Sequence, residues 1–120
     1  MMPKSRLVIT PEMMAAAYDY LATTKPFCDW NLPDSEDVTF LVYRSKINHG
    51  EWSIVNGRHK IWVSSHFATR TDALMQTLAH EMIHVHESHN KCSGKTDHSA
   101  AFNAWAHEVC EIHGWDPVLF

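Results

Sequence analysis

Hydrophobic residues near the N-terminus recur at the three- and four-residue spacing of one helical face. The residues on this face are Met14, Ala17, Tyr18 and Leu21. Just before them, Thr10-Pro11-Glu12 supplies a helix-capping residue, a proline at the first helical position and an acid in the first turn. The pattern predicts a helix from Pro11 to Thr24 that ends before Pro26.

From Val38 onward the pattern changes to runs of β-branched and aromatic residues, which are typical of strands. Three such runs follow one another, with the sequences VTFLVYR, EWSIV and HKIWVSS. Asn48-His49-Gly50 separates the first two runs, and Asn56-Gly57, a strong hairpin signal, separates the last two. The pattern predicts a three-stranded antiparallel meander.

Helical periodicity returns after a connection at residues 66–70. The buried stripe of this helix is expected to consist of Leu74, Leu78, Met82 and Val85. A polar loop, NKCSGKTD, leads to a last helix that starts near His98 and ends at Gly114, shortly before Pro117. The order of helix, strands, helix and helix is that of a single α+β domain spanning residues 1–120.

Composition and charge narrow the class of protein. The 45% hydrophobic content supports a globular domain, and no apolar run approaches the roughly 20 residues needed to cross a membrane. We therefore expect a cytoplasmic protein without a membrane partner. The net charge of −4 argues against a generally basic nucleic-acid binder. Residues 38–70 nevertheless hold five basic residues and one acid, Glu51, a local charge of +4.

The segment LAHEMIHVHESH, residues 78–89, places His80 and His84 four positions apart, with Glu81 directly after the first. At about 100° per residue the two histidines lie about 40° apart on one side of the helix, so both imidazoles can reach one metal ion. Glu81 lies on the neighbouring face, where it can reach a metal-bound water. The probability that composition alone produces H-E-x-x-H in this chain is about one in twenty. The placement of both histidines on one side of the helix, away from its apolar stripe, favours a metal site.

A catalytic zinc site usually takes three protein ligands and one water, so a third ligand is needed. The metzincin pattern is excluded because Glu87 and Asn90 stand where it needs glycine and histidine. His86 and His89 are expected on the surface near the end of the helix.

His98, at the start of the last helix, is the preferred third ligand. It shares the apolar face of that helix, which must pack against the helix that carries His80 and His84. Glu108 and Glu111 on the same last helix are the alternatives.

The paired motifs resemble a known family. HEMIH followed by DHSAAF is similar to the H-E-M-I-H and H-G-x-x-F signature of the SprT-like (Spartan-type) zinc metalloproteases. IWVSS and DALMQTLAHEMIH are similar to the strand and active-site helix of that family, and the resemblance covers about residues 38–113. Ser99 stands where the family usually has glycine, and the chain lacks the C-x-x-C pairs of a C-terminal zinc ribbon.

The resemblance implies a zincin-like fold and a zinc-dependent metallopeptidase, with Zn²⁺ held by His80, His84 and His98. Its substrates would be proteins or peptides, bound by strand addition to an edge strand within residues 61–65. The named relatives cleave proteins crosslinked to DNA, so DNA-associated proteins are candidate substrates and DNA is a candidate partner. Zinc would lower the pKa of its bound water to about 7, and Glu81 would act as the general base.

Other polar residues receive secondary roles. Asp97 is expected to cap the last helix, with orientation of a ligand histidine as the alternative. The side chains considered as oxyanion donors are Tyr43, His49, His66 and His89, with a structural role preferred for each. Surface positions are expected for His59, His107 and His113, and packing roles for Trp52, Trp62 and Trp105. The alternative function is a non-catalytic, zinc-stabilised module that binds a partner or DNA.

Overall fold

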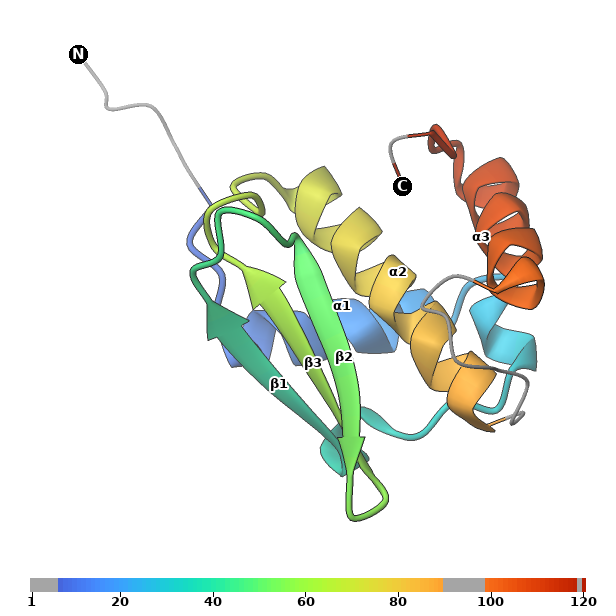
Figure 1. The fold of residues 1–120 in the computed structure, drawn as a ribbon, viewed down its shortest axis with the longest axis horizontal. Helices are drawn as coiled ribbons and strands as arrows, with labels where there is room; N and C mark the ends of the chain where they lie inside the picture. The colour runs from blue at the N-terminus through green and yellow to red at the C-terminus, as the bar shows by residue number, and fades with distance from the viewer. Residues whose placement is uncertain (1–6, 90–98, 119) are drawn as a thin grey trace.

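The computed structural model describes residues 7–89, 99–118 and 120. Within these residues the chain forms three α-helices, two short 3-10 helices and a three-stranded sheet (Figure 1). The elements in chain order are α1 (Pro11–Ala22), η1 (Phe27–Asp29), η2 (Ser35–Asp37), β1 (Val38–Tyr43), β2 (Gly50–Val55), β3 (Arg58–Ser64), α2 (Thr71–His89) and α3 (Ala100–His113). The α+β class is as predicted. None of the helices in these parts of the chain is long and apolar enough to cross a membrane.

Helix α1 begins where the sequence predicts. The side chain of Thr10 accepts a hydrogen bond of 3.1 Å from the backbone N–H of Met13, which satisfies one of the amides left open at a helix start. The helix ends at Ala22, two residues before the predicted end. There the hydroxyls of Thr23 and Thr24 donate to carbonyls of the last helical turn.

The sheet is mixed, so the predicted antiparallel meander is wrong. Its strand order is β1-β3-β2, with β1 parallel to β3 and β2 antiparallel to β3. The hairpin between β2 and β3 is confirmed, and its turn residues Asn56 and Gly57 have φ angles of 52° and 79°. Burial explains the order, because Ile61 and Val63 of β3 are fully buried whereas Ile54 and Val55 of β2 are exposed.

The chain reaches β2 from β1 through residues 44–49, which cross the end of β3. The Ser64 hydroxyl donates to the carbonyl of Ser45 at 2.6 Å, and the Ser64 N–H donates to the carbonyl of His49 at 2.8 Å. Asn48 and His49 are therefore part of a crossover and not of a hairpin turn, and Gly50 is the first residue of β2. The predicted edge strand within residues 61–65 is also wrong, since β3 lies between the other two strands.

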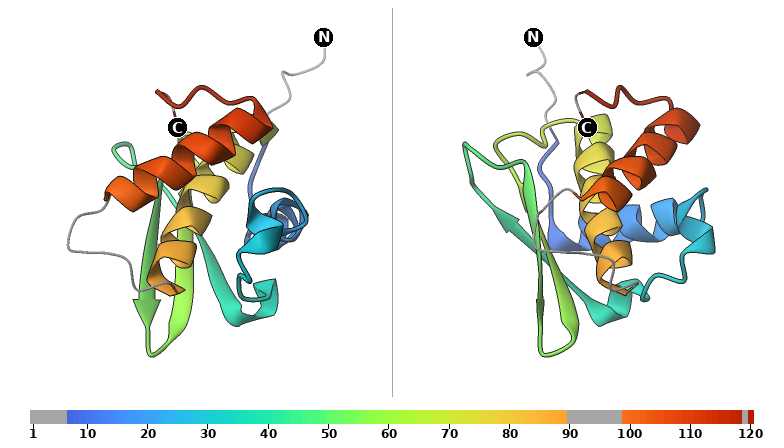
Figure 2. Two further views of the ribbon diagram at one scale, coloured as in Figure 1. Left: turned by 90° about the vertical axis from the view of Figure 1, so that its right-hand side faces the viewer. Right: turned by 45° about the vertical axis from the view of Figure 1, so that its right-hand side comes forward.

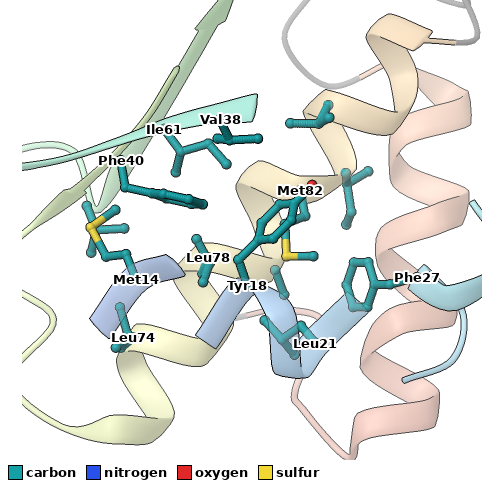
Figure 3. Packing of buried hydrophobic residues seen from close by; sticks show 14 of the residues in the cluster. Met14, Tyr18, Leu21, Phe27, Val38, Phe40, Ile61, Leu74, Leu78 and Met82 are labelled. Atoms are coloured by element: carbon teal, nitrogen blue, oxygen red, sulfur yellow. The ribbon is translucent and has the colours of Figure 1, made fainter. Parts of the chain in front are cut away.

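Helices α1 and α2 cover one face of the sheet, and α2 lies between the sheet and α3 (Figures 1 and 2). The predicted stripe on α2 is confirmed, since Leu74, Leu78, Met82 and Val85 are all buried. Figure 3 shows side chains from α1, α2 and the strands converging on one core. The labelled members from these elements are Met14, Tyr18, Leu21, Val38, Phe40, Ile61, Leu74, Leu78 and Met82. This core fixes α2 against the sheet.

Helix α3 starts with Ser99 as its N-cap, whose hydroxyl accepts a hydrogen bond of 3.1 Å from the N–H of Phe102. The capping role predicted for Asp97 is therefore taken by Ser99, and Asp97 itself lies outside the described residues. The predicted end is confirmed. Gly114 has a φ of 78°, and its N–H donates to the carbonyl of Cys110 at 2.8 Å.

Candidate functional site

His80 and His84 lie one turn apart in the second half of α2. Their ring centroids are 5.4 Å apart, and both side chains are partly buried. The ring of Phe102, in the first turn of α3, lies 5.1 Å from the His80 ring and 4.5 Å from the His84 ring. The packing of α3 on α2 therefore places the start of α3 beside the histidine pair.

Glu81 is buried, with 5% of its surface exposed, and it lies beside the start of β2. A Cβ atom on Gly50 would stand 3.1 Å from Glu81 Oε2 and 2.8 Å from the carbonyl oxygen of Trp62. The absence of a side chain at Gly50 thus lets β2 approach α2 at the glutamate. This role was not predicted, because in the sequence Gly50 only separates two runs of strand-forming residues.

Trp52 on β2 connects the sheet to the histidine pair. Its indole stacks on the His84 ring, with centroids 5.8 Å apart and planes inclined by 12°. Its Nε1–H donates to Nδ1 of His59 at 3.0 Å. His59 is only 4% exposed, so its predicted surface position is wrong. A period-two pattern gives no information on which large side chain of the neighbouring strand covers a residue.

Glu87 and Ser99 form a second link between α2 and α3. Glu87 is 6% exposed, and its Oε1 lies 4.0 Å from Nδ1 of His84. Its Oε2 accepts a hydrogen bond of 2.5 Å from the Ser99 hydroxyl. Neither contact of Glu87 was predicted, because each depends on how α3 packs on α2 or on the rotamers within α2.

The residues after α3 return to α2. The Phe120 ring lies 5.4 Å from the His80 ring and stacks on Trp115 at 5.9 Å. His113 stacks on Trp115 at 4.8 Å, and its Nε2 lies 2.9 Å from the carbonyl oxygen of Lys25. His113 is therefore a partly buried contact between the helix ends and not the surface residue that was expected.

His86 faces away from this site. It is 9% exposed and stacks on Trp30, with centroids 4.0 Å apart and planes inclined by 9°. Trp105 of α3 meets the same ring at 4.5 Å in an edge-on arrangement. The predicted surface position of His86 is thus wrong, whereas the packing role of Trp105 is confirmed. The prediction failed because Trp30, which directly follows η1, is far from His86 in the sequence but covers it in the fold.

The side chains considered as oxyanion donors are scattered. His49 stacks on Phe67 at 3.9 Å, and His66 meets the same ring edge-on at 4.8 Å. The side chain of His89 lies outside the described residues. The hydroxyl of Tyr43 is buried, and no described group forms a hydrogen bond with it.

Two carboxylates lie close enough to Tyr43 to affect its ionisation. Burial raises the pKa of Tyr43 to about 12, and the carboxylates of Glu51 and Glu81 add to the shift. The hydroxyl of Tyr43 therefore keeps its proton at neutral pH and is able to donate it in a hydrogen bond.

The third predicted metal ligand, His98, lies outside the described residues. Among residues 7–89, 99–118 and 120, no group of three or more His, Cys, Asp or Glu side chains is arranged to hold a metal ion. Glu108 and Glu111 are exposed on α3, so the structure does not bring these alternatives to the histidine pair. The described residues thus supply two imidazoles and one carboxylate.

These features define a small α+β domain whose longest helix carries H-E-x-x-H beside an edge of the sheet. The model of the SprT-like family matches residues 15–117. The chain belongs to the SprT-like family, which confirms the resemblance seen in the two motifs and extends it to α1. No curated protein matches the chain in a sequence comparison.

Proposed function

We propose that this protein is a zinc-dependent metallopeptidase that hydrolyses peptide bonds in protein substrates. Family membership is consistent with a metallopeptidase-like domain. The observation that carries the proposal is the buried side chain of Glu81, which directly follows the first of the two histidines paired on one side of α2. Two imidazoles on one side of a helix suit Zn²⁺, and a purely structural zinc site would not need the buried glutamate that follows the first of them.

The zinc ion would be held by His80, His84 and His98. Phe102 contacts the rings of both helix-α2 histidines, and it follows His98 by four residues in the sequence. This supports a third ligand at His98, because the start of α3 already lies beside the pair. It also agrees with the finding that the described residues contain no complete group of three or more side chains able to hold a metal ion.

A bound zinc ion would polarise the scissile carbonyl and lower the pKa of water to about 7. Glu81 accepts a proton from the attacking water and returns it to the nitrogen of the leaving amine. Trp52 and Phe102 both contact the ring of His84, and these contacts fix its orientation. Their aromatic surface also limits the access of bulk water on that side.

The substrate would lie along β2. In the described part of the chain β2 pairs only with β3, so its other edge offers backbone N–H and C=O groups to an extended peptide. The strand runs past the site, with Gly50 beside Glu81 and Trp52 beside His84. An extended segment of a protein added at this edge would therefore pass the carboxylate and the imidazoles. This proposal places substrate binding on β2 in place of residues 61–65.

Metal content tests the proposed ligand set. Purified protein without a tag would be reconstituted with zinc and measured by mass spectrometry beside His98→Ala, with folding of both checked by circular dichroism. We expect about one zinc per chain in the wild type and a marked loss in the folded variant. Wild-type protein that binds no zinc would contradict the proposal.

Hydrolysis tests the role of Glu81. With an unfolded protein as substrate, with and without DNA, Glu81→Gln should keep its zinc and lose activity by about 10²-fold or more. Undiminished activity would show that Glu81 is not the base. Zinc binding without hydrolysis of any unfolded protein would favour the alternative of a non-catalytic, zinc-stabilised module, and DNA-dependent hydrolysis would identify DNA as a partner.

A further inference from the structure

Glu87 is a buried carboxylate that the proposed chemistry does not use. It follows His84 by three residues, so it lies on the same side of α2 one turn further along. Only 6% of its surface is exposed. Carboxylates are rarely buried to this extent unless a partner compensates for the lost hydration, so its two contacts are informative.

The two oxygens of Glu87 face different elements. Oε1 lies 4.0 Å from Nδ1 of His84, which is too long for a hydrogen bond but within reach of an electrostatic contact. Oε2 accepts the hydroxyl hydrogen of Ser99. The Ser99 oxygen in turn accepts the N–H of Phe102 and so caps α3. One continuous set of contacts therefore runs from His84, through Glu87 and Ser99, into the first turn of α3.

We propose that Glu87 is a positioning residue that orients His84 for metal binding and couples that orientation to the start of α3. This inference rests on the proposed zinc site. A carboxylate that faces Nδ1 favours the tautomer with its proton on Nδ1, which leaves Nε2 as the nitrogen for a metal. The carboxylate also makes the imidazole a better electron donor.

The second contact of Glu87, with Ser99, connects the carboxylate to the DHSAAF motif that contains the proposed third ligand. Ser99 directly follows His98 in the sequence, so the hydrogen bond to Glu87 holds the chain next to the proposed third ligand. The family signature usually has glycine at this position, and glycine has no hydroxyl to donate. The serine is therefore explained by its two bonds, one to the carboxylate and one to the helix start.

Zinc affinity separates this role from a structural one. Glu87→Gln keeps an oxygen that can accept the Ser99 hydroxyl, but it removes the negative charge beside His84. We expect the variant to fold and to bind zinc about 10- to 100-fold more weakly in competition with a chromophoric chelator. Asp72→Asn is the matched control, because Asp72 is an exposed carboxylate in the first turn of α2. Its zinc affinity should equal that of the wild type.

Cobalt substitution gives a second readout that a merely structural role would not change. The visible absorption bands of Co²⁺ report the geometry of its ligands, and we expect them to shift in Glu87→Gln but not in Asp72→Asn. Thermal unfolding of the metal-free proteins would show whether Glu87→Gln is folded. If it is not, Ser99→Ala, which leaves the charge in place but frees the carboxylate, should lower zinc affinity by a smaller factor.

The outcomes distinguish the two proposals. Wild-type zinc affinity and unchanged cobalt bands in a folded Glu87→Gln would overturn the positioning role and leave the zinc site intact. A wild-type protein that binds no zinc would overturn both. Weaker zinc binding in Glu87→Gln, in a protein that hydrolyses no substrate, would support the positioning role and contradict only the peptidase activity.

Discussion

The indole of Trp52 on β2 stacks on the imidazole of His84 on α2, with ring centroids 5.8 Å apart and ring planes 12° from parallel. The same indole donates its N–H to the buried His59 on β3. One tryptophan thus joins the central strand, the edge strand and the helix that carries the histidine pair. The orientation of His84 depends on the sheet as well as on its own helix.

Replacing Trp52 tests this connection. Trp52→Phe keeps an aromatic ring but removes the N–H, so Nδ1 of buried His59 loses its donor. We expect the free energy of unfolding to fall by about 1–3 kcal/mol, measured by urea denaturation. Trp62→Phe is the control, because Trp62 alternates with the buried Ile61 and Val63 and so points to the other face of the sheet. Equal losses in the two variants would contradict the role of the bond to His59.

The close approach of β2 to Glu81 predicts a large effect of a single methyl group. In Gly50→Ala the new Cβ would meet the Trp62 carbonyl oxygen at 2.8 Å, and a backbone atom cannot move aside without shifting the strand. We expect a loss of stability of about 1–3 kcal/mol, together with reduced peptidase activity in the folded fraction.

Gly57→Ala provides the control for this substitution. Its Cβ would meet nothing within 4 Å, but its φ of +79° is unfavourable for alanine. We expect a comparable loss of about 1–2 kcal/mol without any change in the activity of the folded protein. Reduced activity in both variants would show that the effect at Gly50 is not local to Glu81.

Removal of the metal should lower the thermal stability of the protein. A ligand present at 100 times its Kd stabilises the native state by about 2.7 kcal/mol, which for a domain of this size corresponds to a Tm shift on the order of 10 °C. Differential scanning fluorimetry with zinc or with excess chelator would measure the shift. His84→Ala should show little dependence on the chelator, and a chelator effect as large as that of the wild type would argue against His84 as a ligand.

The raised pKa of Tyr43 predicts that the stability of the folded protein decreases at alkaline pH. This pKa is raised from the ordinary 10.0 to about 12, first by burial and then by nearby carboxylates. The contribution to stability is therefore fully present below pH 10 and is lost as the pH rises through 12. Tyr43→Phe should match or exceed the wild type at neutral pH and lose less stability between pH 10 and 12, as measured by urea midpoints. Tyr20→Phe, which alters an exposed tyrosine and keeps Tyr43, should decline as the wild type does. A decline in Tyr43→Phe as large as that of the wild type would contradict the assignment.

Features that depend on a few neighbouring residues could be predicted from the sequence. Thr10 caps α1, Gly114 ends α3 and Asn56-Gly57 forms the hairpin turn, as expected. The pairing of His80 and His84 on one helical face is equally local, because it follows from the helical repeat alone.

Features that depend on distant segments could not be predicted. The position of β3 between its neighbours follows from the burial of Ile61 and Val63 in the core, and the alternation of apolar and polar residues within a strand does not encode the order of the strands. His86 is covered by Trp30, a residue more than fifty positions earlier in the chain. The contact between Glu87 and Ser99 likewise requires the packing of α3 on α2 to be known.

The crossover at residues 44–49 has a consequence for the order of folding. β2 and β3 are joined by a tight turn. By contrast, the pairing of β1 with β3, such as Val38 with His59, closes a longer loop that contains the crossover and β2. Closing the longer loop loses more chain entropy, so we expect the hairpin to form first and β1 to dock later. Until β1 arrives, the apolar edge of β3 is open to strands of other molecules. The interval before β1 docks is therefore the stage at which the folding chain is most exposed to aggregation.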